Sequence, residues 1–325
     1  HNLSYDPFSL ITYSRTRDGQ PNARFIPVFS RPSLKLFNTH SQQLIERFHL
    51  RNLRIAGRAQ RLEKIADGWR VITENGGLEA RRVMLAIGAT EQPLWTDWAM
   101  HVRAANAPIH HVFDVNFDRN KLPTWSHAVI IGGGITAAQL ALSLAKEQPG
   151  NVTLLMRHTI REHSFDSDPC WVTYICAQDF HAANDRNHRR KLIKRARHTG
   201  SMPADVARDL SDAAAKGLLR VSIGEVTDAT FQKQICLNTT GTLNADLVLL
   251  ATGFDPQRPG GEWLDRAIAD YELPIANCGY PIVDETLCWQ PGLYVSGPLA
   301  ELEIGPVSRN IIGARLAGER LAATF

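Results

Sequence analysis

Three small residues in one short segment have the spacing of a dinucleotide-binding turn. Gly132, Gly134 and Ala137 form the pattern G-x-G-x-x-A, with Ile135 and Thr136 before its last member. In such a turn the first glycine permits a tight bend, the second lets the backbone approach a pyrophosphate, and the third lets a helix pack closely on a strand. The pyrophosphate then lies at the positive end of the helix, where backbone N–H groups point at it. The alternative interpretation is a glycine turn that only packs tightly.

The segments around this turn are the elements that it needs. An apolar run, 128–131, comes directly before it, and a long amphipathic helix is predicted directly after it. Residues 149–150, Pro-Gly, stop that helix, and a second apolar run, 152–156, follows. Strand, turn, helix and strand make a complete βαβ pattern, so we predict nucleotide binding here.

The end of the second strand indicates which nucleotide is bound. NAD and FAD sites usually place Asp or Glu at this position to hold a ribose diol, but this chain has Arg157 and His158. A cation favours the 2′-phosphate of NADPH. We therefore predict that Arg157 binds this phosphate and that His158 assists. The alternative is that Arg157 is a solvated strand end.

Length and composition exclude several classes of protein. The chain has 325 residues, which suggests about two domains, and its 44% hydrophobic and 21% charged residues are typical of a folded protein. A net charge of +3 is too small to imply nucleic acid, and no apolar run is long enough to span a membrane. A small-molecule substrate and a cytoplasmic location are the default expectations. The five cysteines include no C-x-x-C pair, which disfavours a disulfide scaffold, a zinc ribbon and a dithiol redox centre.

Other segments give a coarser pattern. A helix is expected at about 41–49, short strands from residue 53 to 89, helices in 161–217, and strands again in 218–254. Ser201 is a candidate N-cap for the last of these helices, and Gly217 is at the expected position after its end. The basic run 186–197 is interpreted as a solvated helical face.

Two further apolar strands end in a common A-[IT]-G pattern, at Val83–Ala89 and at Val248–Phe254. Together with the glycine turn, these strands resemble those of the two-dinucleotide flavoproteins. Two further segments carry the resemblance, IHHVFDVNF and the terminal GLYVSGPLAELEIGPVSRN. Within that family the chain is most similar to flavin-containing monooxygenases and to lysine and ornithine N-hydroxylases. His110 and His111 lie in a segment that resembles the one before the NADPH turn in these enzymes. The alternative is that they are two loop histidines whose hydrogen bonds are satisfied within the protein.

The resemblance implies an α/β fold in which a Rossmann-like NADPH-binding domain is inserted in a truncated FAD-binding domain. It implies FAD-binding residues in 1–115, an NADPH domain in 116–255 and a return to the FAD domain in 256–325. In this family the A-[IT]-G strands mark where the chain crosses between the two domains. The resemblance would therefore place Ala251, Thr252 and Gly253 near the cofactors. Near the flavin it would place Gly297, Pro298, Ile304, Gly305 and Pro306, with a helix beginning at Pro306. Pro298 departs from the Asp that related flavoproteins often have.

The flavin fingerprint expected near the start of this family is missing from the sequence. Residues 1–50 contain one glycine, Gly19, and no strand–turn–helix pattern around it. Truncation is the simplest account, because the first residue is His1 rather than Met, although a partner chain or a real loss of flavin would also explain it.

The resemblance implies an FAD- and NADPH-dependent monooxygenase that acts on a small nucleophilic substrate, as in N-hydroxylation. A flavoprotein reductase without oxygenation is the alternative enzyme, and a degenerate nucleotide-binding protein is the non-enzyme alternative. No G-x-S-x-G or H-E-x-x-H pattern is present, so no catalytic or metal-binding residue is assigned.

Overall fold

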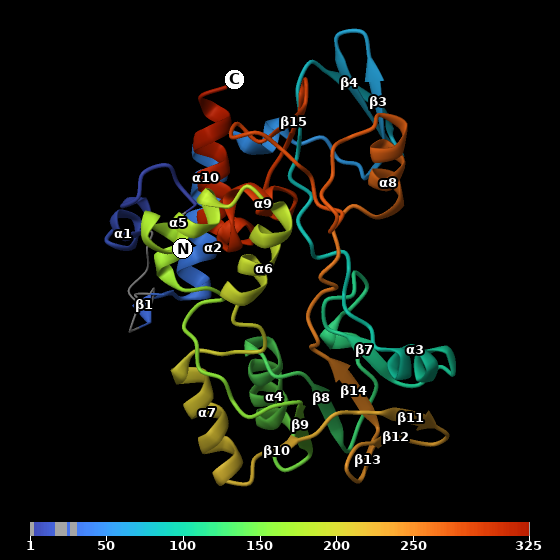
Figure 1. The fold of residues 1–325 in the computed structure, drawn as a ribbon. Helices are drawn as coiled ribbons and strands as arrows, with labels where there is room; N and C mark the ends of the chain where they lie inside the picture. Colours follow the sequence, from blue (N-terminus) through green and yellow to red (C-terminus); the bar gives the residue numbers. More distant parts are fainter. Residues whose placement is uncertain (1–2, 17–24, 27–30, 325) are drawn as a thin grey trace. The chain divides into compact units, whose positions relative to one another are not determined.

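The computed structural model describes residues 3–16, 25–26 and 31–324 (Figure 1). The chain divides into two compact units. Unit 1 comprises His1–Gly88, Trp171–Ile193 and Gly260–Phe325, and unit 2 comprises Ala89–Cys170 and Lys194–Pro259. These boundaries differ from the predicted domains 1–115, 116–255 and 256–325. The prediction assigns residues 171–193 to the NADPH domain, whereas they pack within unit 1.

Unit 2 is built on a parallel sheet with the strand order β10-β9-β8-β14-β7. The strands are β7 (Ile109–His111), β8 (Ala128–Ile131), β9 (Val152–Met156), β10 (Arg220–Ile223) and β14 (Leu247–Leu250). Every neighbouring pair is parallel. The central strands are continuous apolar runs because both faces of the sheet are covered. The strand order reverses between β8 and β14, which is where ligands bind in open α/β sheets.

One face of this sheet is covered by α4 (Ile135–Glu147) and α7 (Ala204–Ala215), whose buried residues share a core with β8 and β9. The other face is covered by α3 (Asp97–Ala104) and by a small antiparallel sheet of β11 (Asp228–Phe231), β12 (Ile235–Asn238) and β13 (Thr242–Ala245). The predicted βαβ unit, the α/β fold class and the position of Gly217, with φ +69°, are confirmed. The N-cap prediction is wrong: the residue before α7 is Pro203, and Ser201 lies outside the helix.

Unit 1 has a three-stranded sheet in the order β15-β16-β6. Its strands are β15 (Cys288–Gln290), β16 (Leu293–Val295) and β6 (Val83–Leu85), and β6 runs parallel to β16. A separate antiparallel sheet contains β3 (Ala59–Ile65), β4 (Gly68–Thr73) and β5 (Gly76–Ala80), with α8 (Gly261–Asp270) packed on β3. The predicted strands in 53–89 are thereby confirmed.

The remaining elements of unit 1 are mainly short. They are α1 (Ser9–Ser14), β1 (Phe25–Ile26), β2 (Arg31–Pro32), α2 (Leu34–Arg47), α5 (Tyr174–Ala182), α9 (Glu301–Ile304), α10 (Ile311–Ala322) and most of α6 (Arg186–Ala196). Helix α2 begins earlier than the expected residue 41, because the Ser33 hydroxyl accepts the Leu36 N–H and caps its first turn. The expected helix from Pro306 is also corrected. Pro306–Arg309 is a separate 3-10 turn, and α10 begins at Ile311 after Asn310, whose side chain accepts the Gly313 N–H.

The basic run 186–197 is only partly solvated. Arg189 and Arg190 are buried, at 7% and 9% exposure, and they pair with Glu303 and Glu301 respectively. The prediction of a solvated face is wrong for these residues, because their partners come from a segment more than one hundred residues later in the chain.

Among the described residues, no helix combines the length and apolar character needed to cross a membrane. Cys170 and Cys176 are disulfide-bonded, whereas Cys236, Cys278 and Cys288 are free thiols. The spacing of Cys170 and Cys176 did not predict this bond.

Candidate functional site

The glycine turn lies between β8 and α4, beside the end of β14. Gly132 has φ +152°, and a Cβ there would lie 2.5 Å from the Ala251 carbonyl oxygen and 3.2 Å from the Ala137 Cβ. Only glycine therefore fits between the two strands. Gly134 caps α4 with φ −98°, and a Cβ there would meet nothing closer than 3.8 Å. Gly200 and Ser201 lie in ordinary van der Waals contact with that position, so a glycine here is not required for packing but would let the backbone approach a pyrophosphate.

The end of β9 brings His158 against this turn. The His158 Nδ1–H donates to the Thr159 carbonyl oxygen at 2.8 Å, because a carbonyl can only accept. A Cβ at Gly133 would lie 2.8 Å from His158 Cε1, so the middle glycine of the GGG sequence makes room for the imidazole. The G-x-G-x-x-A spacing does not predict this role of Gly133, although the three consecutive glycines are a visible signal for it.

Arg157 points into solvent at the same strand end. Its side chain is 74% exposed, and its guanidinium lies 3.8 Å from the carboxylate of Glu225, which is 69% exposed. An ion pair this long and this exposed contributes little to stability. The guanidinium can therefore exchange Glu225 for a phosphate at small cost.

A second group of predicted residues lies at the end of β14. The Thr252 hydroxyl donates to the Leu94 carbonyl oxygen at 2.6 Å. Since this uses its single proton, the His111 Nε2–H must donate to Thr252 Oγ1, at 3.0 Å, while His111 Nδ1 accepts the Phe113 N–H. The side chain of Thr252 thus anchors the chain crossing, and the backbone is anchored as well, because the Ala251 N–H donates to Ile131 and the Gly253 carbonyl accepts from Leu94.

His111 lies in β7 rather than in a loop, and it is fully buried. Burial lowers its pKa from 6.5 to about 4, although the nearby Asp114 opposes the shift. The neutral imidazole with a proton on Nε2 is the form that its two hydrogen bonds require.

This burial predicts a pH dependence of stability. Because the folded pKa is lower than the unfolded value, the contribution of His111 is complete above pH 6.5 and is lost as the pH falls toward 4. We expect a loss of about 3 kcal/mol from the free energy of unfolding over that interval. Urea denaturation at pH 7 and at pH 4.5 measures it. His111→Gln should flatten the dependence, whereas His101→Gln on the exposed face of α3 should preserve it.

The residues expected near a flavin gather in unit 1, after β16. Gly297 and Gly305 have φ +61° and +94°, and a Cβ at Gly297 would meet nothing within 4 Å. Pro298, Ile304 and Pro306 are buried beneath this backbone. The backbone at Gly297 is open to a ligand, whereas Gly305 is buried against Phe180, and no glycine turn for phosphate accompanies them in the described part of unit 1. Gly19 lies outside the described residues.

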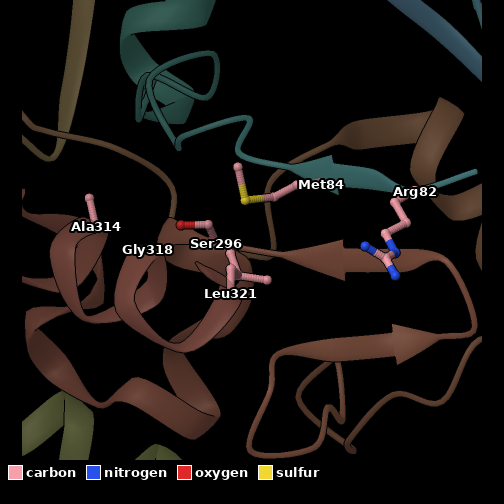
Figure 2. A pocket seen from close by; sticks show the side chains of 6 residues that line it. All are labelled: Arg82, Met84, Ser296, Ala314, Gly318 and Leu321. Atoms are coloured by element: carbon pink, nitrogen blue, oxygen red, sulfur yellow. The ribbon is translucent and has the colours of Figure 1, made fainter. Parts of the chain in front are cut away.

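Strand β6 has one paired side and one open side in the described sheet. The Val83 N–H donates to Gly292, and the Leu85 carbonyl accepts from Ser296, so both residues face β16. Met84 therefore directs its N–H and carbonyl to the opposite edge of β6, and Met84 is 48% exposed. A pocket of about 330 Å³ lies there between β6 and α10 (Figure 2). Its lining residues are Arg82, Met84, Ser296, Ala314, Gly318 and Leu321.

A parallel sheet with its glycine turn at the point where strand order reverses defines a dinucleotide-binding protein. Residues 27–202 match the family model described as pyridine nucleotide-disulphide oxidoreductase, and the chain belongs to this family. A comparison with curated proteins finds no match.

Solved structures share the fold over nearly the whole chain. An ornithine N-hydroxylase from Kutzneria sp. 744 is 16% identical with a TM-score of 0.71, covering 99% of this chain and 82% of that one. An L-lysine 6-monooxygenase from Pseudomonas syringae is 16% identical with a TM-score of 0.67, covering 91% and 77%. A bacillithiol disulfide reductase from Bacillus cereus is 16% identical with a TM-score of 0.56, covering 94% and 81%. The resemblance to two-dinucleotide flavoproteins is confirmed at the level of the fold.

Proposed function

We propose that the protein is an FAD- and NADPH-dependent monooxygenase that hydroxylates the nitrogen of a small amine. The observation that carries this proposal is the fold shared over 99% of the chain with an ornithine N-hydroxylase. Other amine oxygenases among the similar structures, of lysine and of cadaverine, support the same substrate class. We also place the protein in the cytoplasm on this proposal.

The residues of unit 2 fit NADPH. Gly134, which has no side chain, would let a pyrophosphate approach the N-terminus of α4, and Gly132 and Ala137 hold that helix close to β8. Arg157, with His158 beside it, would bind the 2′-phosphate. NADPH would supply a hydride, and these residues would bind and orient it.

The residues of unit 1 fit only part of FAD. The open backbone at Gly297 suits close approach of a ligand, but the described residues of this unit offer no glycine turn for the pyrophosphate. No step of the flavin chemistry is therefore assigned to residues of this chain. The open edge of β6 is where an added parallel strand, with its turn and helix, would extend the sheet.

The test is NADPH oxidation with FAD in large excess, since weak flavin binding is expected, with ornithine, lysine or cadaverine as the amine, in air and without oxygen. The proposal requires oxygen-dependent oxidation and a hydroxylamine product. Oxidation that continues without oxygen when a quinone or a disulfide is supplied, and yields no hydroxylamine, would contradict it.

The second candidate function is an NADPH-dependent reductase of a thiol or quinone acceptor. The bonded cysteines Cys170 and Cys176 and the similarity to a disulfide reductase favour it. Cys170→Ser should abolish reduction of a disulfide acceptor if this function is correct, whereas amine-dependent oxygen consumption should survive the change if the protein is a monooxygenase.

The exposed guanidinium at the end of β9 predicts nucleotide preference. Arg157→Ala should weaken NADPH binding by about 10- to 100-fold, because a charge-assisted contact to the 2′-phosphate is lost, and should leave NADH binding nearly unchanged. Glu225→Ala removes only the competing carboxylate and is the matched control. Titrations followed by nicotinamide fluorescence measure the dissociation constants of NADPH and NADH. Equal affinity of the wild type for the two nucleotides would refute the assignment of Arg157 to the 2′-phosphate.

These 325 residues should hold FAD weakly or not at all. Micromolar affinity needs about 8 kcal/mol, and the described residues of unit 1 offer no glycine turn that would contribute the phosphate contacts. Purification followed by an absorption spectrum at 450 nm tests this expectation. Stoichiometric bound FAD would show that a phosphate site exists elsewhere in the chain.

A further inference from the structure

The N-terminus of α4 is in contact with another segment of unit 2. Residues 198–202, which we name the strap, pass over the glycine turn. The Ile135 N–H, first in the helix, donates to the Ser201 carbonyl oxygen at 3.1 Å. Gly200 lies against the same turn, with its Cα 3.8 Å from the Cβ position of Gly134.

The strap also covers the imidazole at the end of β9. Gly200 has φ +70°, and a Cβ there would lie 2.7 Å from His158 Nε2. Glycine is therefore required at this position for the strap to lie on His158. Gly133 leaves room for His158 from the other side. The imidazole is thus held between the glycine turn and the strap.

The strap is fastened to residues 161–168 by several bonds. The Met202 N–H donates to the Arg161 carbonyl, the His163 N–H donates to the Met202 carbonyl, and the His198 N–H donates to Asp166. The His198 ring stacks on His163 at 3.6 Å, and its Nε2 lies 3.1 Å from the Asp168 carboxylate. The Ser201 hydroxyl donates to the His198 carbonyl. The Met202 side chain is buried in the core of unit 2, whereas the other residues in these contacts are exposed or half-buried. The strap can therefore open around Met202 without unfolding the sheet.

A pyrophosphate at this turn and the Ser201 carbonyl compete for one N–H group. The carbonyl oxygen also carries partial negative charge, which would repel a phosphate at the same place. We propose that the strap is a built-in cover of the dinucleotide site, and that NADPH binding displaces it. The inference rests on the proposed nucleotide function of unit 2.

Displacement has a measurable effect on affinity. A nucleotide that binds only the open form has an apparent dissociation constant equal to its intrinsic dissociation constant divided by the fraction of protein that is open. Asp168→Ala removes an exposed contact that holds the strap, so it should tighten NADPH binding by about two- to fivefold. Gly200→Ala should tighten binding further, because the strap can no longer lie on His158. Asp209→Ala, an exposed carboxylate on α7 outside these contacts, is the matched control and should bind like the wild type.

Hydrogen–deuterium exchange of the wild type gives a test that does not depend on a variant. With saturating NADPH, peptides covering 161–164 and 197–203 should exchange faster than without it, whereas a ligand that leaves the strap in place would slow them. NADPH binding with unchanged or slower exchange in both peptides, or Asp168→Ala binding no tighter than Asp209→Ala, would overturn the cover and leave the nucleotide function standing. No NADPH binding by the wild type or by either loosened variant would overturn both.

Discussion

Gly134→Ala should fold like the wild type and lose most of its NADPH affinity. Its backbone has φ −98°, which any residue adopts, and the added methyl would have only ordinary contacts, at 3.8 Å, with Gly200 and Ser201. The same methyl would occupy the space through which the backbone approaches a pyrophosphate. We expect a loss of about tenfold or more, measured by nicotinamide fluorescence.

Gly132→Ala is the matched comparison, two residues away in the same turn. Its methyl would lie 2.5 Å from the Ala251 carbonyl oxygen, at a φ of +152° that other residues rarely adopt. We expect it to lower the free energy of unfolding by about 3 kcal/mol or more. Thermal denaturation separates the two effects. If Gly134→Ala bound NADPH as tightly as the wild type, the turn would have only a packing role.

Glu301→Ala should strongly destabilise unit 1. Glu301 is fully buried, its Oε2 accepts from Arg309 Nε at 2.9 Å, and its other oxygen contacts the Arg190 guanidinium. Both arginines also contact Tyr280, Arg309 through its hydroxyl and Arg190 over its ring. Removing the carboxylate leaves two cations in a buried setting, which costs about 3–5 kcal/mol.

The matched control is Glu262→Ala on α8. Glu262 also pairs with an arginine, Arg266, at 3.4 Å, but both side chains are largely exposed. Its removal should change stability by less than about 0.5 kcal/mol. Urea denaturation followed by circular dichroism compares the two variants. A loss in Glu301→Ala no larger than that in Glu262→Ala would mean that the buried carboxylate does not hold α6 and α9 together.

The dinucleotide turn could be predicted because its determinants are adjacent in sequence. The spacing of Gly132, Gly134 and Ala137, and the apolar runs on both sides, are local, and the structure confirms the strand, helix and strand that they indicate. The A-[IT]-G strands were likewise found from local apolar pattern, and they are β6 and β14.

The tertiary structure decided what the polar residues contact. Ser201 was expected to cap α7 because a hydroxyl residue precedes that helix, but its carbonyl instead accepts an N–H from a helix that begins 66 residues earlier. Arg189 and Arg190 belong to a run that resembles a solvated face, and only folding brings Glu303 and Glu301 to them. Helix and strand patterns depend on neighbours within a few residues, whereas the partner of a buried charge or of a helix end depends on which distant segments pack together.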